Sequence, residues 1–289
     1  KTLTDKGAQA SIAFWAAFTN KGSPTALADC AFNHEQAIMV KRDPGTSGAF
    51  WVLTQNENQG HARKVALSSG ALQADKPFPT MNHPVDLFIG ENLAVIGNQS
   101  GSGTIQVFDR GGNQLAETSP KDGMGRDHFS AIAGDGQGNY YVAGRRRAAK
   151  ENVANSQLED FMLWAFQRGN DGQLQALWRS AGGSANGREW GRDVSVLTNG
   201  DVLVTGAFSG SMILNGFDSA NPRLLGSSGQ GALNQSGDDF EGFLARFNAD
   251  GSLLWAETSG YPGNDFSTKM ARGKDASGEF VYLTGESKK

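Results

Sequence analysis

The chain has 289 residues, of which 38% are hydrophobic and 19% charged, a balance that supports a packed core and argues against intrinsic disorder. Its net charge is -4 and its one dense basic run is residues 145–147, so the composition also argues against a nucleic-acid-binding protein. A single cysteine, Cys30, excludes an intramolecular disulfide and a cysteine-based zinc site, and no apolar run reaches the length of a transmembrane helix.

Turns that end in glycine divide the chain into short apolar runs without a helical period. A first kind of hairpin recurs five times: an apolar strand, a turn that ends in glycine and a second strand. Glycine adopts the positive φ that a tight hairpin turn needs, so each copy predicts two antiparallel strands. In chain order, the first strands of these copies are residues 12–18, 62–67, 104–108, 161–166 and 242–247.

A second kind of hairpin alternates with the first, and its clearest copy runs from Asp193 through the turn Asn199-Gly200 to Gly206. Its strands are rich in β-branched and aromatic residues, the composition of a half-buried pleated surface. The remaining copies end at residues 51–54, 93–97, 140–144 and 281–285.

The order of the hairpins predicts the architecture. The chain begins with a hairpin of the first kind and ends with one of the second kind, and four complete pairs lie between them. Joining the two end hairpins in one sheet closes a ring and removes two exposed sheet edges. We therefore expect an all-β fold, a single five-bladed β-propeller over residues 1–289 closed by N-terminal and C-terminal half blades. The expected blades span about 32–80, 81–120, 123–185, 186–260, and 264–289 joined to 8–28.

Two segments, GDGQGNYYVAG at 134–144 and DFEGFLARFNADGSLLW at 239–255, resemble the bacterial β-propeller repeat called the SBBP repeat. That repeat combines an Asp-led strand, Gly-Asn and Tyr-Val-Thr-Gly with Asp-x-Phe-Val-x-Lys and Asp-Gly-x-x-x-Trp. The resemblance covers roughly residues 123–285. It implies a propeller, usually in secreted or surface-attached bacterial proteins, and it implies no shared chemistry. The family commonly has more blades than the five expected here.

Propellers usually bind ligands where the loops that enter the innermost strands converge, and three of these loops repeat the pattern Gly-x-Asp. The pattern places Asp127, Asp193 and Asp265 at this position, with Arg126 and Arg192 as middle residues. One interpretation is a polar ring that holds a sugar through hydrogen bonds. The other is that each aspartate caps the turn before its strand by bonding to the backbone, which a repeated turn would require.

Three of the four histidines also lie where blades begin: His34, His83 and His128. Together with the aspartates they are a candidate site for a divalent metal ion, since imidazole and carboxylate bind zinc, manganese and calcium in different mixtures. Spacing across blades does not by itself show that side chains converge, so the alternative is that no metal or other cofactor binds.

Trp190 lies at the start of a blade and is the candidate for stacking on a sugar, because an indole offers a flat apolar face and a polar N–H. Two long insertions, 145–160 and 207–239, are expected to leave from second strands, and residues 145–147 offer three arginines to an anionic glycan or partner. Decoration without a binding role is the alternative for both insertions.

The leading functional hypothesis is an extracytoplasmic binding propeller (secreted, periplasmic or on the cell surface) that recognises a glycan or a protein partner. A chain that begins at Lys1 instead of Met indicates a processed product. The second hypothesis is a carbohydrate-active enzyme, a glycoside hydrolase or lyase that uses the channel face, although no carboxylate pair has a distinctive signature. The third is a structural subunit of an extracellular assembly.

Overall fold

The computed structural model is built from antiparallel β-sheets, which confirms the all-β prediction. Every named element within the described residues is a strand, and none of these residues forms a helix long and apolar enough to cross a membrane. The structure describes residues 13–18, 24–30, 36–46, 48–55, 59–66, 69, 71–78, 81, 83–99, 102–120, 125–148, 159–169, 171–184, 187–216, 222–226, 240–259, 264–276 and 278–288.

Four sheets each contain a complete meander of four strands, paired in chain order from an inner to an outer strand. The first contains β3 (Gln36–Arg42), β4 (Ala49–Gln55), β5 (Gly60–Ala66) and β6 (Leu72–Phe78). The second contains β7 (Pro84–Ile89), β8 (Leu93–Gln99), β9 (Ser102–Phe108) and β10 (Gln114–Thr118). The third contains β11 (Gly125–Gly134), β12 (Asn139–Ala148), β13 (Glu159–Arg168) and β14 (Leu174–Gly183). The fourth contains β15 (Glu189–Val196), β16 (Val202–Ser209), β19 (Phe240–Phe247) and β20 (Leu253–Ser259).

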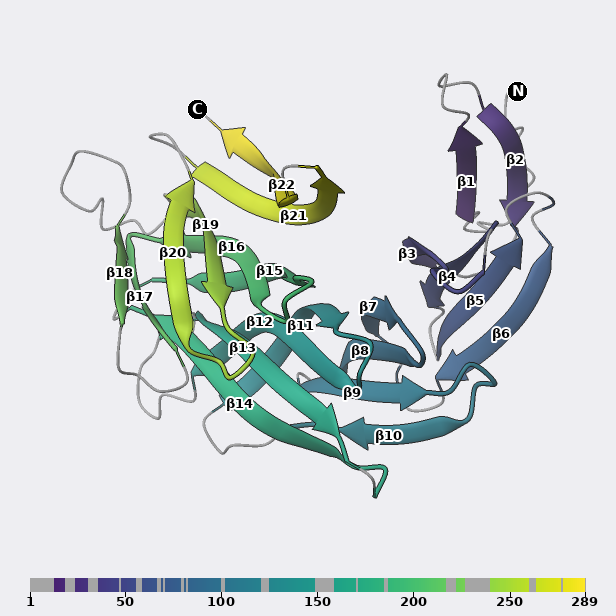
Figure 1. The fold of residues 1–289 in the computed structure, drawn as a ribbon, viewed down its shortest axis with the longest axis horizontal. Coiled ribbons are helices and arrows are strands. Elements are labelled where there is room, and N and C mark those ends of the chain that lie inside the picture. The colour runs from purple at the N-terminus through teal and green to yellow at the C-terminus, as the bar shows by residue number, and fades with distance from the viewer. Residues whose placement is uncertain are drawn as a thin grey trace, which may run out of the picture.

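The sheets follow one another along an arc in chain order (Figure 1). Their first strands, β3, β7, β11 and β15, lie on the inner side of the arc, and their last strands, β6, β10, β14 and β20, lie on the outer side. Consecutive inner strands contact one another, from β3 to β7, β7 to β11 and β11 to β15. Residues that begin an inner strand are therefore brought towards the centre of the arc, as the sequence predicts.

Apolar layers between neighbouring sheets form the core. Tyr140 and Val142 pack in the layer against the second sheet, whereas Tyr141 and Ala143 pack in the layer against the fourth. Since both faces of the third sheet are covered, the run 140–143 is apolar throughout instead of alternating with polar residues. This arrangement explains why continuous apolar runs in this sequence are strands.

The inner strand of each of the four sheets contains a β-bulge at the same place, opposite residues 53/54, 96/97, 143/144 or 205/206 of its neighbouring strand. In β15 the extra residue is Arg192, between Gly191, which faces Gly206, and Asp193, which faces Thr205. The bulge presses the carbonyl oxygen of Trp190 against the Cα of Gly206, where a Cβ would overlap it. Glycines 97, 144 and 285 meet the carbonyl of the corresponding residue in the same way, so the repeated terminal glycine of the second hairpin is a steric requirement.

The predicted closing blade is not found as one sheet. The hairpin of β1 (Ala13–Phe18) and β2 (Pro24–Cys30) and the hairpin of β21 (Asn264–Asp275) and β22 (Gly278–Lys288) are separate two-stranded sheets. They lie at the two ends of the arc in Figure 1. Large hydrophobic side chains are exposed in the sheets near both ends: Val40, Leu72, Leu254 and Tyr282.

The insertion 207–239, expected as a long loop, contains two strands, β17 (Ser211–Asn215) and β18 (Arg223–Gly226). They extend the outer edge of the third sheet, where β17 pairs with β14. Met212 and Leu214 are buried there, whereas Ile213 and Leu224, which face each other across the two strands, are exposed. The short apolar run at 212–214 is the sequence signal that a loop assignment overlooked.

Candidate functional site

The bulges define which side chains are equivalent at the entrance to each inner strand. His83, His128 and Trp190 all lie two residues before the bulge of their strand, and Phe266 does so in β21. His34 lies four residues before the bulge in β3, so it is not at the equivalent position, and it falls outside the described residues. The histidine pattern therefore continues into a tryptophan and a phenylalanine, which makes it a pattern of aromatic side chains rather than of metal ligands.

The register also changes the expected alignment of the acidic residues. Asp127 and Asp265 lie three residues before their bulges, and the residue at that position in β15 is Glu189. Asp193 instead follows its bulge directly, as Asp86 does in β7. The matching sequence in the fourth sheet is thus Gly187-Arg188-Glu189, and the Gly-x-Asp pattern at 191–193 is a coincidence of spacing.

Asp86 and Asp193 join consecutive sheets through the backbone. Asp193 accepts a hydrogen bond from the N–H of Val194 at 3.0 Å and a second from the N–H of Met270, on β21, at 2.8 Å. Asp86 accepts the corresponding bonds from Leu87 at 2.7 Å and from Ile132, on β11, at 2.9 Å. The capping interpretation therefore applies in a modified form, because each aspartate also bonds to the backbone of the next inner strand.

Asp127 is held inside the third sheet and does not point to an open site. Its carboxylate accepts bonds from Arg146 Nε at 2.7 Å, Arg146 Nη2 at 2.9 Å and Trp164 Nε1 at 3.1 Å. Both oxygens are thereby occupied in a buried, bidentate ion pair. Asp265 is also buried, at the start of β21, and the side chain of Arg126 lies outside the described residues.

Trp190 and Arg192 come together with two residues of the preceding sheet. The indole Nε1 of Trp190 donates to Glu159 Oε2 at 2.6 Å, and the same oxygen lies 3.3 Å from Arg145 Nη1. The guanidinium carbons of Arg192 and Arg145 lie 4.7 Å and 5.8 Å from the centroid of the Trp190 ring. We call these four residues, Arg145, Glu159, Trp190 and Arg192, the Trp190 cluster; it spans the junction of the third and fourth sheets.

Two further aromatic rings continue this cluster towards β21. Phe240 stacks on Trp190, with 4.9 Å between the ring centroids and an interplanar angle of 22°, and Phe266 lies 5.0 Å from Phe240. The indole of Trp190 is therefore in contact with an aromatic ring as well as with two guanidinium groups. Trp190 therefore positions the arginines, and the side chain of Arg145 is 35% exposed.

Positive charge is concentrated at Arg192. Burial lowers the pKa of this guanidinium, and repulsion by Arg145 lowers it further, while Glu159 opposes the shift. Its Nε is buried without a hydrogen-bond partner among the described residues. A guanidinium that is short of acceptors and next to a second one favours an anionic ligand.

Glu189 lies beside Trp190 in the chain and is fully buried. Its Oε1 accepts from Ser184 Oγ at 2.7 Å, and within the described part of the chain its Oε2 has no partner. Burial raises the pKa of this carboxyl to about 8, with a further contribution from the charge of Asp160. At neutral pH Glu189 is therefore a protonated acid.

The expected metal site is not formed by the residues that the structure describes. Among them, no three His, Cys, Asp or Glu side chains come together in a way that would hold a metal ion. His83 is exposed, and His128 faces Arg145 across the strand pair of β11 and β12. An arginine is a poor neighbour for a bound cation, so the surroundings of His128 do not fit a divalent metal.

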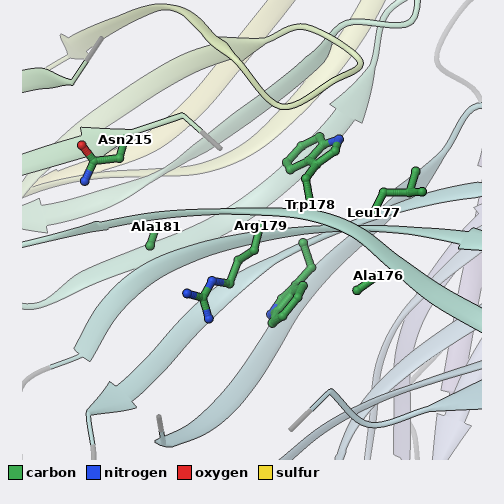
Figure 2. Close-up of a pocket in the computed structure, with 7 residues that line it drawn as sticks. Ala176, Leu177, Trp178, Arg179, Ala181 and Asn215 are labelled. Atoms are coloured by element: carbon green, nitrogen blue, oxygen red, sulfur yellow. The ribbon is translucent and has the colours of Figure 1, made fainter. Parts of the chain in front are cut away.

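A shallow groove of about 460 Å³ lies elsewhere, along β14 on the outer side of the third sheet. Figure 2 shows Leu177, Trp178 and Arg179 on this strand, with Asn215 of β17 across the groove. Arg179 lies over the ring of Trp164, 5.4 Å from its centroid. The groove thus repeats the combination of tryptophan and arginine found at the Trp190 cluster, without a second arginine over the ring.

Sequence reasoning found Trp190, Arg192 and the arginines 145–147, but it missed Glu159, Phe240 and Glu189. Glu159 and Phe240 each begin the third strand of a meander, where the insertions return to the sheet. A polar or aromatic residue at the point where an insertion returns to a sheet is the signal by which such site residues could be found in the sequence. The raised pKa of Glu189 has no signal in the sequence, because it depends on which side chains face the carboxyl.

No protein-family model and no curated protein matches the chain. Solved structures match it at low identity. A protein of unknown function from Bacteroides caccae is 14% identical, with a TM-score of 0.42 over 83% of this chain and 87% of the other. A mutant of Synechocystis apocarotenoid oxygenase is 11% identical, with a TM-score of 0.44 over 83% of this chain and 64% of the other, so this chain spans less than two thirds of that enzyme. The Dos1 propeller is 7% identical, with a TM-score of 0.47 over 86% and 69% of the two chains.

Each of these likenesses has a low identity and a TM-score below 0.5, and none of them says anything about the activity of this chain. The membership of the SBBP repeat family inferred from residues 134–144 and 239–255 stays a prediction, because no family model matches.

Proposed function

We propose that this chain is a binding propeller that recognises a carbohydrate at the Trp190 cluster, with a protein partner as the alternative. The observation that carries the proposal is the convergence of one indole and two guanidinium groups, from two different sheets, on the entrance side of the inner strands. Arginine and tryptophan are the residues that recur at the energetic centre of binding sites. Asp127 and Asp193 contribute by holding the inner strands in place, and Asp265 is buried at the start of β21.

The proposal includes a closed ring of five blades, with β1 and β2 completing the blade begun by β21 and β22. Five inner hairpins with the same bulge support it, since the fifth, β21–β22, lacks the outer strands that the other four possess. Two-stranded sheets are marginally stable alone, and the exposed Val40, Leu72 and Tyr282 lie near the ends that a joint blade would cover.

The proposed location is outside the cytoplasm of a bacterium, on a secreted or surface-attached protein. The resemblance of residues 134–144 and 239–255 to the SBBP repeat supports this location. Detection of the protein in the medium or on the surface of intact producing cells tests it, and its confinement to the cytoplasm would contradict it.

A glycan array followed by calorimetric titration of the best ligand tests the binding function. Trp190→Phe keeps an aromatic ring and removes the Nε1–H that bonds to Glu159, so we expect at least about a tenfold loss of affinity. Trp178→Phe is the matched control, because its indole also donates one bond, to the carbonyl of Ala249, and Trp178 lies on the outer strand β14 whereas Trp190 lies on the inner strand β15. Binding to no glycan, or equal losses in both variants, would contradict the proposal.

One observation favours a carbohydrate-active enzyme instead. Glu189 has its pKa raised to about 8 and so holds the proton that a glycosidase needs in its acid. The same residue is fully buried, which keeps it from a substrate in this structure. Mass spectrometry of the bound oligosaccharide after long incubation separates the two functions: an intact ligand supports binding, and cleavage that Glu189→Gln abolishes would establish the enzyme.

A further inference from the structure

The two arginines of the Trp190 cluster have unequal partners. Arg145 lies 3.3 Å from Glu159 Oε2, and the same oxygen also accepts the indole N–H of Trp190. Arg192 has no ion pair or hydrogen bond to a carboxylate among the described residues, and its Nε is buried without a partner. Of the charged groups that contact the indole, two are cations and one is an anion.

The backbone of β15 determines the position of Arg192, and the placement of its guanidinium does not depend on a flexible, extended side chain. It is the extra residue of the β15 bulge, and its neighbours Gly191 and Asp193 are fixed by pairing with β16. Stacking on Trp190 at 4.7 Å further restricts the guanidinium. A preorganised arginine binds a carboxylate with little loss of side-chain entropy, and its planar fork matches the two carboxylate oxygens.

We infer that the ligand of the Trp190 cluster is an acidic saccharide, and that Arg192 receives the carboxylate of a uronic acid while Arg145, held by Glu159, adds positive charge beside it. The inference rests on the proposed carbohydrate-binding function and names its ligand class. Because the indole is already in contact with Phe240 and Arg192, recognition comes from the charge of the sugar more than from stacking on its ring.

Matched ligands test this inference. The probes are short oligomers of galacturonate and of glucuronate, each compared by calorimetry with the same oligomer after methyl esterification, which removes the charge and keeps the sugar rings. We expect the wild type to bind at least one acid form about tenfold or more tightly than its ester, with an affinity that falls as salt rises. Arg192→Gln should reduce the affinity for the acid form to about the affinity for the ester.

Arg179→Gln is the control variant, because it also removes a guanidinium from above a tryptophan, at the β14 groove. It should leave every affinity unchanged, and thermal melting of both variants shows whether they are folded. If Arg192→Gln does not fold, Arg192→Lys, which keeps the charge without the fork, should lose part of the preference for the acid.

Equal binding of acid and ester by the wild type would overturn the inference and leave the proposed carbohydrate-binding function intact. A preference for the acid that survives in Arg192→Gln, or disappears in Arg179→Gln, would also overturn it, because the charge would then be recognised elsewhere. No binding of either uronate oligomer overturns the inference, and no binding of any glycan on the array overturns the proposed function as well.

Discussion

Asp127 and Glu189 occupy the same position relative to their bulges and meet different partners. Asp127 faces Arg146 across the strand pair and forms a buried ion pair with it, whereas Glu189 faces Phe208. Without a cation opposite, burial raises the pKa of Glu189 to about 8. One residue on the neighbouring strand thus decides whether a buried acid in this repeat has a cation to pair with.

Replacing Glu189 with glutamine is expected to remove a pH dependence of stability. The pKa is about 8 in the folded state and 4.5 without the fold, so the unfolded chain binds fewer protons between these values and the free energy of unfolding falls as pH rises. Glu189→Gln should therefore become more stable relative to wild type by roughly 1 kcal/mol per pH unit across this interval. Urea unfolding at several pH values measures the difference.

The exposed Glu257, on β20, supplies the control for that experiment. The free energy of unfolding of Glu257→Gln should vary with pH as that of the wild type does. Parallel curves for wild type and Glu189→Gln would show that Glu189 ionises as freely in the folded protein as in the unfolded chain, contrary to its burial.

At the scale of a single strand pair, the bulge and its facing glycine act as one unit. The bulge in β15 turns the carbonyl of Trp190 towards Gly206, and it also places Arg192 next to the indole. A side chain at position 206 would therefore disturb both the sheet and the Trp190 cluster.

Gly206→Ala tests this unit. The new Cβ would overlap the carbonyl oxygen of Trp190 and lie 2.7 Å from the ring of Phe243, so we expect a loss of roughly 1–3 kcal/mol in unfolding free energy and weaker ligand binding. Gly226→Ala, in β18, has no atom within 4 Å of the added Cβ and should change neither. Equal stability of the two variants by urea unfolding would mean that the bulge shifts at little cost.

The hairpins could be predicted because their pattern repeats along the sequence. The register of the bulges and the contacts between sheets could not, because no repeated pattern marks them. The turn glycines and the terminal glycine of each second hairpin are local requirements of the backbone, so the four complete meanders follow from the sequence. The register of the bulges is not visible there, which is why Asp193 was aligned with Asp127. Glu159 joins Trp190 across a sheet junction, and the sequence has no local signal for such a contact.

The architecture of the whole molecule depends on whether the hairpins at the two ends of the arc pair with each other. Phe266 and Met270 connect β21 to the fourth sheet. On its other side, the hairpin of β21 and β22 pairs with no strand among the described residues. A central entrance where ligands converge requires that this hairpin belongs to a complete ring. The predicted five-bladed ring supplies that neighbour from β1 and β2. The open arc of Figure 1 leaves β22 as an edge strand, which proteins normally cover or protect.

Hydrogen–deuterium exchange of the full chain measures directly whether β22 is paired on both sides. If the two end hairpins share one sheet, the amides of β22 that point away from β21 exchange as slowly as those of β16, which lies between two strands in the fourth sheet. The outer strand β20, paired on one side only, gives the rate of a free edge in the same sample. The account predicts slow exchange along β22; exchange as fast as on the free side of β20 would contradict the closed ring.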